Sequence, residues 1–312
     1  NLNITKNGET GKISIDEATY IPVYMYRAPA TGKLQRYKLL DVKANIQKYD
    51  DGTDTSLGKT TFVLQLADSV ALRGNDVLII SLEMARSELM AKSISRLTAD
   101  LVITNDKYGK TCYPKTARGI TDGARYASYT ELEKELIKDA VNAYGQFAER
   151  VYIREGNGDI SVKEVRAAVE QHKKITGNMP VVIVDYIQIL YPYDIKANEK
   201  VNTDRAITEL KRISRDYKTP VIGISSYNRA KYNEKADLAA FKESGGIEYG
   251  SDVLISLQYT GVGEKEFKID AARQAEPRKV ELVILKNRNG QVGKVLPFDY
   301  YPKYNRFRER CK

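Results

Sequence analysis

The residues best suited to chemistry are Gly58, Lys59 and Thr60, at the end of a short polar run that begins at Thr53. Their spacing is typical of a Walker A loop, whose backbone amides wrap phosphate groups at a helix N-terminus, where the helix dipole also favours negative charge. Lys59 would reach the β- and γ-phosphates of ATP, and the Thr60 hydroxyl would bind Mg²⁺. The pattern predicts a site for ATP and Mg²⁺, which Ser56 and Thr61 would also line.

Two carboxylates complete this prediction. Four apolar residues lead into Asp185, as in a Walker B strand, whose carboxylate holds the magnesium shell. Glu83 closes the apolar run 77–82, at the sheet edge where ligands collect, and could polarise the attacking water. Each residue also has a plainer interpretation: Asp185 as the end of an ordinary buried strand, and Glu83 as a charge that complements a helix dipole.

The loop departs from the usual pattern in two ways. Thr53 stands in place of the first glycine, with Gly52 one position early, and segment 44–51 is polar where a buried strand should precede the loop. Either that strand lies outside this sequence, or the loop is held in an unusual way. Taken alone, the loop predicts nucleotide binding and nothing more specific.

The amino-acid composition limits which side chains could carry out catalysis. The 312 residues include two cysteines and one histidine, which excludes a disulfide framework and a Cys/His zinc cluster. His172 lies in a charged stretch and is predicted to be a solvated residue on a helix face. Carboxylates, lysines, arginines and bound metal must therefore do the chemistry. The net charge of +9 weakly favours a polyanionic partner. Without a long apolar run or signal-like N-terminus, we expect no membrane association and a cytoplasmic location.

The hydrophobic pattern predicts an α/β fold with a mainly parallel sheet covered by helices on both faces, because short apolar runs alternate with helix-length amphipathic segments. Helix 60–73 should turn Val63, Leu66, Ala67 and Val70 inward. The other predicted helices are 87–97, 130–148, 161–174 and 204–217, and the predicted strands are 77–82, 151–153, 181–187, 221–225, 253–257 and 280–285.

Three segments carry weaker patterns. Residues 1–50 read as a poorly patterned extension or linker, in which 20–26 could be a strand and 39–49 a short helix, before a single ATPase domain over 51–312. Residues 100–128 read as a polar insert. Residues 261–279 are charged and without periodicity, and are predicted to be a mobile loop.

Five ordered segments together resemble the DnaB-type helicase family. They are Ser81–Met84, Asp185–Gln188, the stretch from Glu209 to Arg229, Phe241–Asp252 and Lys286–Gly290, spread over about residues 53–306. The resemblance implies a RecA-like P-loop NTPase fold and an ATP-driven DNA helicase motor of a phage, plasmid or Firmicutes type. Ser226 stands where the family usually has glutamine at its nucleotide sensor.

The resemblance also implies roles that spacing alone could not assign. Lys286 and Arg288 would reach the ATP site of a neighbouring subunit, as an arginine finger does, which makes hydrolysis depend on a ring that is typically hexameric. Single-stranded DNA would pass through the ring, and a primase or a helicase loader would be a further partner. The residues implied at the DNA are Lys242, Glu243, Gly245 and Arg229.

Two other interpretations stay open. A RecA-like recombinase or circadian-type ATPase would share the core but not unwind DNA. A DNA-binding or helicase-docking homologue that has lost turnover would agree with the altered loop at Thr53. The family's N-terminal helical domain is not visible in residues 1–50, which fits a truncated chain or the motor half of a primase-helicase.

Overall fold

The computed structural model describes residues 2–6, 9–13, 24–27, 35–38, 57–109, 111–156, 159–225 and 245–310. The chain divides into two compact units, Asn1–Asp54 and Thr55–Lys312. In the first unit, β1 (Leu2–Lys6) pairs antiparallel with β2 (Glu9–Ile13), and β3 (Tyr24–Arg27) pairs antiparallel with β4 (Gln35–Lys38). The strand predicted at 20–26 thus begins later, at Tyr24, whereas the helix predicted at 39–49 lies outside the described residues.

The second unit alternates helices and strands through most of its length. Its α-helices are α2 (Lys59–Leu72), α3 (Arg86–Thr104), α4 (Asp106–Gly109), α5 (Ala117–Thr121), α6 (Gly123–Ser128), α7 (Glu131–Gly145), α8 (Val162–Thr176), α9 (Glu199–Tyr217), α10 (Gly245–Gly250) and α11 (Ile269–Gln274). Its strands are β5 (Val77–Ser81), β6 (Val151–Glu155), β7 (Val181–Asp185), β8 (Val221–Gly223), β9 (Val253–Tyr259), β10 (Arg278–Asn287), β11 (Val295–Tyr301) and β12 (Arg306–Glu309). Three-residue 3-10 helices lie at η1 (Ala148–Arg150), η2 (Ile187–Ile189) and η5 (Pro302–Tyr304).

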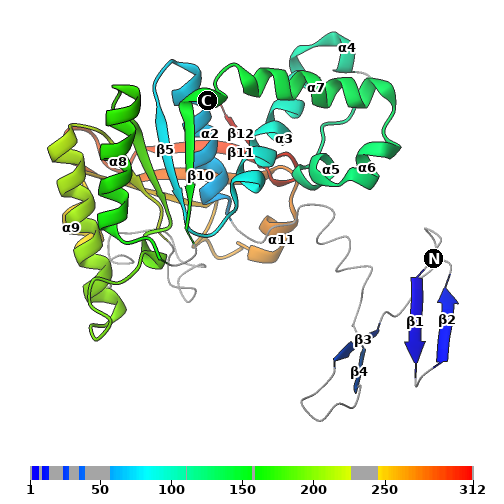
Figure 1. Ribbon diagram of the computed structural model, residues 1–312, viewed down its shortest axis with the longest axis horizontal. Coiled ribbons are helices and arrows are strands. Elements are labelled where there is room, and N and C mark those ends of the chain that lie inside the picture. The colour runs from blue at the N-terminus through cyan, green and yellow to red at the C-terminus, as the bar shows by residue number, and fades with distance from the viewer. Residues whose placement is uncertain are drawn as a thin grey trace. The chain divides into compact units, whose positions relative to one another are not determined.

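The four strands β6, β5, β7 and β8 form a wholly parallel sheet in that order. Helices α8 and α9 cover one face, and α2 lies on the other (Figure 1). The predicted α/β architecture is confirmed. The predicted helices 130–148 and 161–174 correspond to α7 and α8, which Thr130 and Ser161 open with capping boxes.

A second sheet was not predicted. Strands β12, β11, β10 and β9 form an antiparallel sheet in that order, and the sequence had indicated only parts of β9 and β10. Strands β11 and β12 were not predicted because a proline and several charged residues interrupt their apolar pattern. The prediction of a mobile loop over 261–279 was wrong, since Ile269 and Ala272 of α11 pack against this sheet and β10 already begins at Arg278.

The polar insert predicted at 100–128 is also more regular than expected. Helix α3 continues to Thr104, and three short helices follow it. Thr116 caps α5 by accepting from the Gly119 N–H, and the Asp122 carboxylate caps α6. Side-chain caps of this kind stabilise helices too short to show a hydrophobic period, so the sequence pattern could not reveal them.

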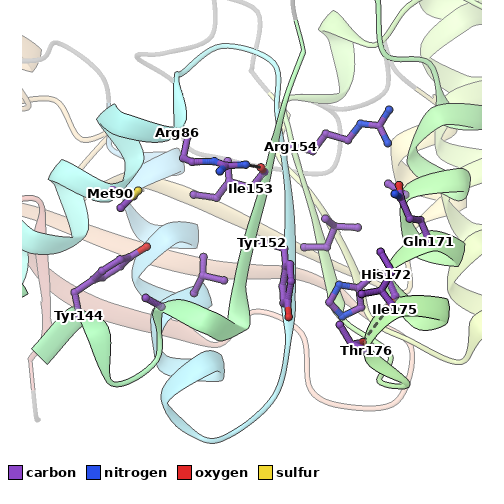
Figure 2. A pocket seen from close by; sticks show the side chains of 14 residues that line it. Arg86, Met90, Tyr144, Tyr152, Ile153, Arg154, Gln171, His172, Ile175 and Thr176 are labelled. Atoms are coloured by element: carbon purple, nitrogen blue, oxygen red, sulfur yellow. Dashed lines mark hydrogen bonds between the residues drawn. The ribbon is translucent and has the colours of Figure 1, made fainter. Parts of the chain in front are cut away.

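The prediction that His172 is solvated was wrong. Instead of being solvated, its side chain is buried on α8, with Nε2 3.1 Å from Oδ2 of Asp76 and its ring edge-on to Tyr152 of the outer strand β6. These rings line a pocket of about 410 Å³ along the β6 edge (Figure 2). Asp76 also pairs with Arg150 and accepts from Asn178, so the histidine belongs to a satisfied polar cluster.

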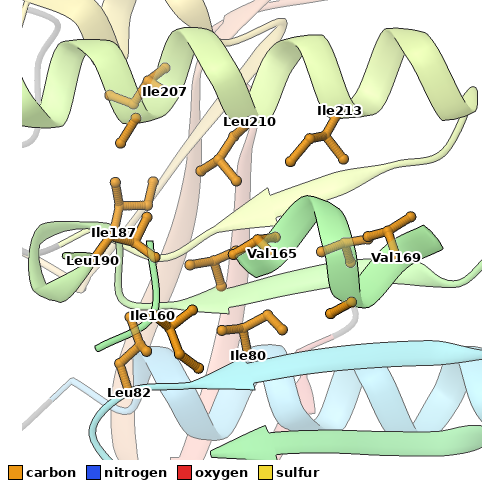
Figure 3. Packing of buried hydrophobic residues seen from close by; sticks show 14 of the residues in the cluster. Ile80, Leu82, Ile160, Val165, Val169, Ile187, Leu190, Ile207, Leu210 and Ile213 are labelled. Atoms are coloured by element: carbon orange, nitrogen blue, oxygen red, sulfur yellow. The ribbon is translucent and has the colours of Figure 1, made fainter. Parts of the chain in front are cut away.

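Two apolar layers cover the parallel sheet, because successive side chains of a strand point to opposite faces. Leu78 and Ile80 of β5 join one layer, to which α9 contributes Ile207, Leu210 and Ile213 (Figure 3). Val77 and Ile79 join the other layer, with α2, α3 and α7. No helix among the described residues is long and apolar enough to cross a bilayer.

The inward face of α2 differs from its prediction. Ala67 is buried as expected, but Leu66 is 39% exposed. Val63 and Val70 are only partly buried, and the buried stripe is rotated to include Leu64 and Ala71. The second sheet, which the sequence did not predict, contacts α2 through Phe62.

Candidate nucleotide-binding site

The predicted phosphate loop meets α2 at Gly58, whose φ of +81° lies in the left-handed region that favours glycine. A Cβ at this position would lie 2.7 Å from Cζ of Tyr300 and 3.0 Å from Cζ of Phe307. Those two rings are stacked with their centres 4.2 Å apart, on β11 and β12. Glycine is therefore needed for the backbone to approach this sheet, and the helix that starts at Lys59 directs its N-terminal end toward the loop.

The second sheet also fixes α2 along its length. The Gln65 side chain donates to the carbonyl oxygen of Phe307 and accepts from its N–H, both at 2.9 Å. Phe62 packs edge-on against Phe298 and Phe307. The C-terminal strands thus position the helix that carries Lys59 and Thr60.

Strands β5 and β7 bring the two predicted carboxylates to one edge of the parallel sheet. Ser81 pairs in register with Asp185, and the Leu82 N–H donates to the Asp185 carbonyl oxygen at 2.9 Å. Glu83 follows at once. Asp185 is only 3% exposed, and neither carboxylate oxygen has a hydrogen bond of ordinary geometry among the described residues. A buried carboxylate is normally paired or bound to a metal, so Asp185 suits a divalent cation.

The electrostatics of Asp185 show which groups surround it. Burial raises the pKa of this carboxyl, and the negative charge of Glu83 raises it further. The adjacent Thr60 side chain lowers the pKa, as do the positive charges of Lys59 and Lys92, without outweighing burial. The structure therefore brings together Lys59, Thr60, Glu83 and Asp185, as the motifs predicted. Their chemical roles, and the binding role of Thr61, stay predictions.

Lys92 is the residue that sequence reasoning missed. It lies on α3, with Nζ 3.4 Å from Oγ1 of Thr61 and 3.2 Å from Oδ1 of Asn305. A weak signal was present, since Lys92 follows Glu83 by nine positions and lies beside the small polar residues Ser93 and Ser95. Polar residues in an otherwise amphipathic helix such as α3 can indicate that this part of the helix lies next to a charged site.

Lys286 and Arg288 lie at the end of β10 and contact the C-terminal end of α10. Lys286 Nζ donates to the carbonyl oxygens of Glu248 and, at 2.9 Å, Ser251. Arg288 donates to the Tyr249 carbonyl oxygen at 3.3 Å. The finger role in a neighbouring subunit stays a prediction, but both cations are attached to the segment implied at the DNA.

Helix α10 begins at Gly245 and lies closely along α9. The Gly246 N–H donates to Oδ1 of Asp204 at 2.9 Å, and a Cβ at Gly250 would lie 2.4 Å from Cγ2 of Ile207. Glycines at both positions allow this close approach. The other predicted site residues lie outside the described part of the chain: Ser56, Ser226, Arg229, Lys242 and Glu243.

Comparisons with known proteins identify the family of this chain. The model of the DnaB-like helicase C terminal domain family matches residues 52–309. The replicative DNA helicase DnaB of Pasteurella multocida is 26% identical over 248 residues, which cover 77% of this chain and 46% of that protein. The replicative DNA helicase DnaC of Bacillus subtilis is 27% identical over 257 residues, covering 81% and 50%. The chain thus spans about half the length of these relatives.

Solved structures show the same fold. One of them, an ATPase domain, superposes with a TM-score of 0.66 at 22% identity, covering 81% of this chain and 80% of that one. A DnaB-like replicative helicase, described with its interactions with primase, gives a TM-score of 0.65 at 22% identity, covering 81% and 54%. The predicted RecA-like fold is confirmed. From the family match over most of its length, together with the fold, the chain belongs to the DnaB-like helicase C-terminal domain family.

Proposed function

We propose that this chain is the ATP-hydrolysing motor of a replicative DNA helicase, which couples hydrolysis of Mg²⁺-bound ATP to movement along single-stranded DNA and to duplex unwinding. The observation that carries the proposal is the buried Asp185 carboxylate, which lacks an ordinary hydrogen bond and is surrounded by Lys59, Thr60 and Glu83. This combination suits a metal-bound triphosphate with a carboxylate beside it.

Each residue has a definite task in this proposal. Thr60 and Asp185 would hold Mg²⁺, which when bound neutralises charge on the phosphate oxygens. Lys59 would bind the β- and γ-phosphates. Glu83 would orient the attacking water and accept its proton, a task that suits a carboxylate close to but not ligating the metal. Lys92 adds a positive charge that acts on Asp185.

Subunit contacts would complete the site. Lys286 and Arg288 would reach the phosphates bound by a neighbouring copy in a ring, typically of six subunits, and stabilise the charge of the transferring phosphoryl group. Lys242, Glu243 and Gly245, with Arg229, would contact the backbone of single-stranded DNA. The attachment of Lys286 and Arg288 to α10 supports this link, because α10 directly follows Lys242 and Glu243 in the chain.

Partners and location belong to the same proposal. One structural relative is described with primase, so a primase or a helicase loader is the proposed protein partner. DNA replication as the setting implies a cytoplasmic location.

The test compares the wild-type protein with Lys59→Ala in two assays, DNA-stimulated ATP hydrolysis and unwinding of a forked duplex. Both activities should be present in the wild type and lost in the variant. Hydrolysis without unwinding would instead support a RecA-like ATPase. An absence of hydrolysis with Mg²⁺ and every DNA tested would contradict the proposal and support a homologue that has lost turnover.

A further inference from the structure

Lys211 joins two elements that the proposed function assigns to different ligands. It lies on α9, and its side chain is 17% exposed. Its Nζ donates to the Gly250 carbonyl oxygen at 2.9 Å and to Oδ1 of Asp252 at 3.0 Å. Lys211 therefore fixes both the C-terminal end of α10 and the carboxylate that follows it.

Arg288 competes for the same carboxylate oxygen. Its NH1 atom lies 3.4 Å from Oδ1 of Asp252, and its backbone N–H donates to the Asp252 carbonyl oxygen at 3.0 Å. The backbone of Arg288 is thus anchored to residue 252. Its guanidinium shares one oxygen atom with the ammonium group of Lys211.

The two cations are held with different strength. Both contacts of Lys211 lie near the ordinary N–H···O distance, whereas the side-chain contacts of Arg288, at 3.3 and 3.4 Å, are long for charge-assisted bonds. Arg288 is also 47% exposed. Lys211 is therefore the anchor of this pair, and the Arg288 guanidinium is the group that can move.

The local charge favours an incoming anion. Lys211, Lys286 and Arg288 face backbone carbonyl oxygens of 248–251 and two carboxylates. Asp252 contacts Lys211 and Arg288 directly, and the charge of Glu248 acts on Lys286. Burial and the charges of Arg288 and Lys211 lower the pKa of Lys286, which shows that this cluster has an excess of positive charge. If Arg288 leaves for a phosphate, Lys211 and Asp252 remain as a neutral pair.

We propose that Lys211 is a positioning residue for Arg288: by occupying Oδ1 of Asp252, it keeps that carboxylate from holding the guanidinium tightly and leaves Arg288 oriented but free to reach a neighbour's phosphate. This inference rests on the proposed finger role of Arg288. Without Lys211, Arg288 would be the remaining ion-pair partner of the Asp252 carboxylate within the described part of the chain. The finger would then be withdrawn toward its own subunit.

The experiment measures kcat and KM of DNA-stimulated ATP hydrolysis at a protein concentration that supports assembly. Lys211→Met should lower kcat by roughly 10- to 100-fold, as expected when a reacting group is misplaced by about 1 Å, and leave KM near the wild-type value. Lys211→Arg should restore most of kcat because it keeps a cation at Asp252. Lys200→Met, an exposed lysine on the same helix, is the matched control.

A second variant separates positioning from folding. Asp252→Asn removes the carboxylate that competes for Arg288, so alone it should keep kcat near the wild-type value, and added to Lys211→Met it should recover kcat. A large loss in Asp252→Asn, or no recovery in the double variant, would overturn the role of Lys211. If Arg288→Ala abolishes turnover while Lys211→Met does not, only the inference about Lys211 fails. If Arg288→Ala keeps full turnover, the proposed finger and the role of Lys211 fail together.

Discussion

The backbone N–H of Leu82 donates to the carbonyl oxygen of Asp185 at 2.9 Å, one residue beyond the end of β5. This bond extends the pairing of two buried parallel strands up to the position before Glu83. The proposed water-orienting carboxylate and the proposed metal ligand are therefore placed by adjacent strands of one sheet. Rigid placement of this kind is what metal-dependent phosphoryl transfer requires of a protein.

Asp185→Asn should stabilise the nucleotide-free protein while abolishing its response to Mg²⁺ and ATP. Burial raises the pKa of Asp185, so its charge destabilises the fold at pH values above the folded-state pKa, and the cost disappears as pH falls below the ordinary value. The variant should therefore melt at a higher temperature than the wild type at neutral pH, with a difference that shrinks in acid. Thermal unfolding with and without Mg²⁺ and ATP measures both effects.

A different result for Asp185→Asn would contradict the proposed metal-binding role of Asp185. A variant that is less stable than the wild type without nucleotide, yet is still stabilised by Mg²⁺ and ATP, would show that this carboxylate has a structural role and does not hold the metal. Glu83→Gln serves as a comparison, because it should slow hydrolysis without removing the stabilisation by nucleotide.

Gly58→Ala should reduce stability and nucleotide binding together. The new Cβ would meet the Tyr300 ring at 2.7 Å in a backbone conformation with φ of +81°. The left-handed conformation alone costs about 1–2 kcal/mol for a non-glycine residue, and the ring contact adds to it. Gly74→Ala is the control. Gly74 has φ of +85°, but apart from its two chain neighbours no heavy atom of the described residues lies within 4 Å of the position that the added Cβ would take.

Comparison of the two glycine variants by thermal unfolding and nucleotide titration isolates the close approach to Tyr300. Both should lose stability from backbone strain, but only Gly58→Ala should lose more and bind nucleotide weakly. Equal losses in both variants, with nucleotide binding retained, would mean that contact between the loop and the second sheet is unimportant.

Asp299 should make stability depend on pH in the direction opposite to Asp185. Burial raises the pKa of Asp299, but hydrogen bonds from Lys279 at 2.6 Å and Arg308 at 2.8 Å outweigh burial, so the pKa is lowered overall. Its stabilising contribution is then present above the ordinary aspartate pKa and is lost as pH falls through the lowered value. Asp299→Asn should destabilise the protein at neutral pH, by an amount that shrinks in acid.

Urea unfolding at several pH values measures this effect. Asp270→Asn is the control, because the Asp270 side chain is 84% exposed and its ion pair with Arg273 is long, at 3.7 Å. A difference between Asp299→Asn and the wild type that stays constant from neutral to acidic pH would show that the cations do not stabilise the Asp299 charge.

The parallel half of the fold could be predicted because its signals are local. Short runs of apolar residues indicate the strands that end at Ser81 and Asp185. Capping boxes at Thr130 and Ser161 indicate where two helices begin. Each of these patterns spans only a few residues. The antiparallel sheet could not be predicted in this way, since its buried Tyr300 packs with residues far away in the sequence, such as Gly58 and Leu257. Local pattern carries no information about such partners.

The candidate site likewise contains residues that local sequence motifs predict and residues that only tertiary packing brings into place. Lys59, Thr60 and Asp185 belong to short motifs with defined spacing, so their proximity was predictable. The sequence around Lys92 carries only a weak polar signal, and the sequence around Lys211 does not identify its partners. The packing of α3 and α9 brings these two lysines to the groups that they contact. His172 was wrongly predicted to be solvated because its neighbours in sequence are charged, whereas its partner Asp76 is 96 positions away.

The central claim is that ATP is hydrolysed at a boundary between two copies of this chain, with Glu83 from one and Arg288 from the other. Mixing two inactive variants tests it most directly. Glu83→Gln keeps the finger and Arg288→Ala keeps the water-orienting carboxylate, so mixed rings contain some boundaries with both residues intact. DNA-stimulated ATP hydrolysis should be very low for either variant alone and recover in part on mixing. A mixture no more active than its separate components, under conditions where mixed assemblies form, would contradict a site shared between subunits.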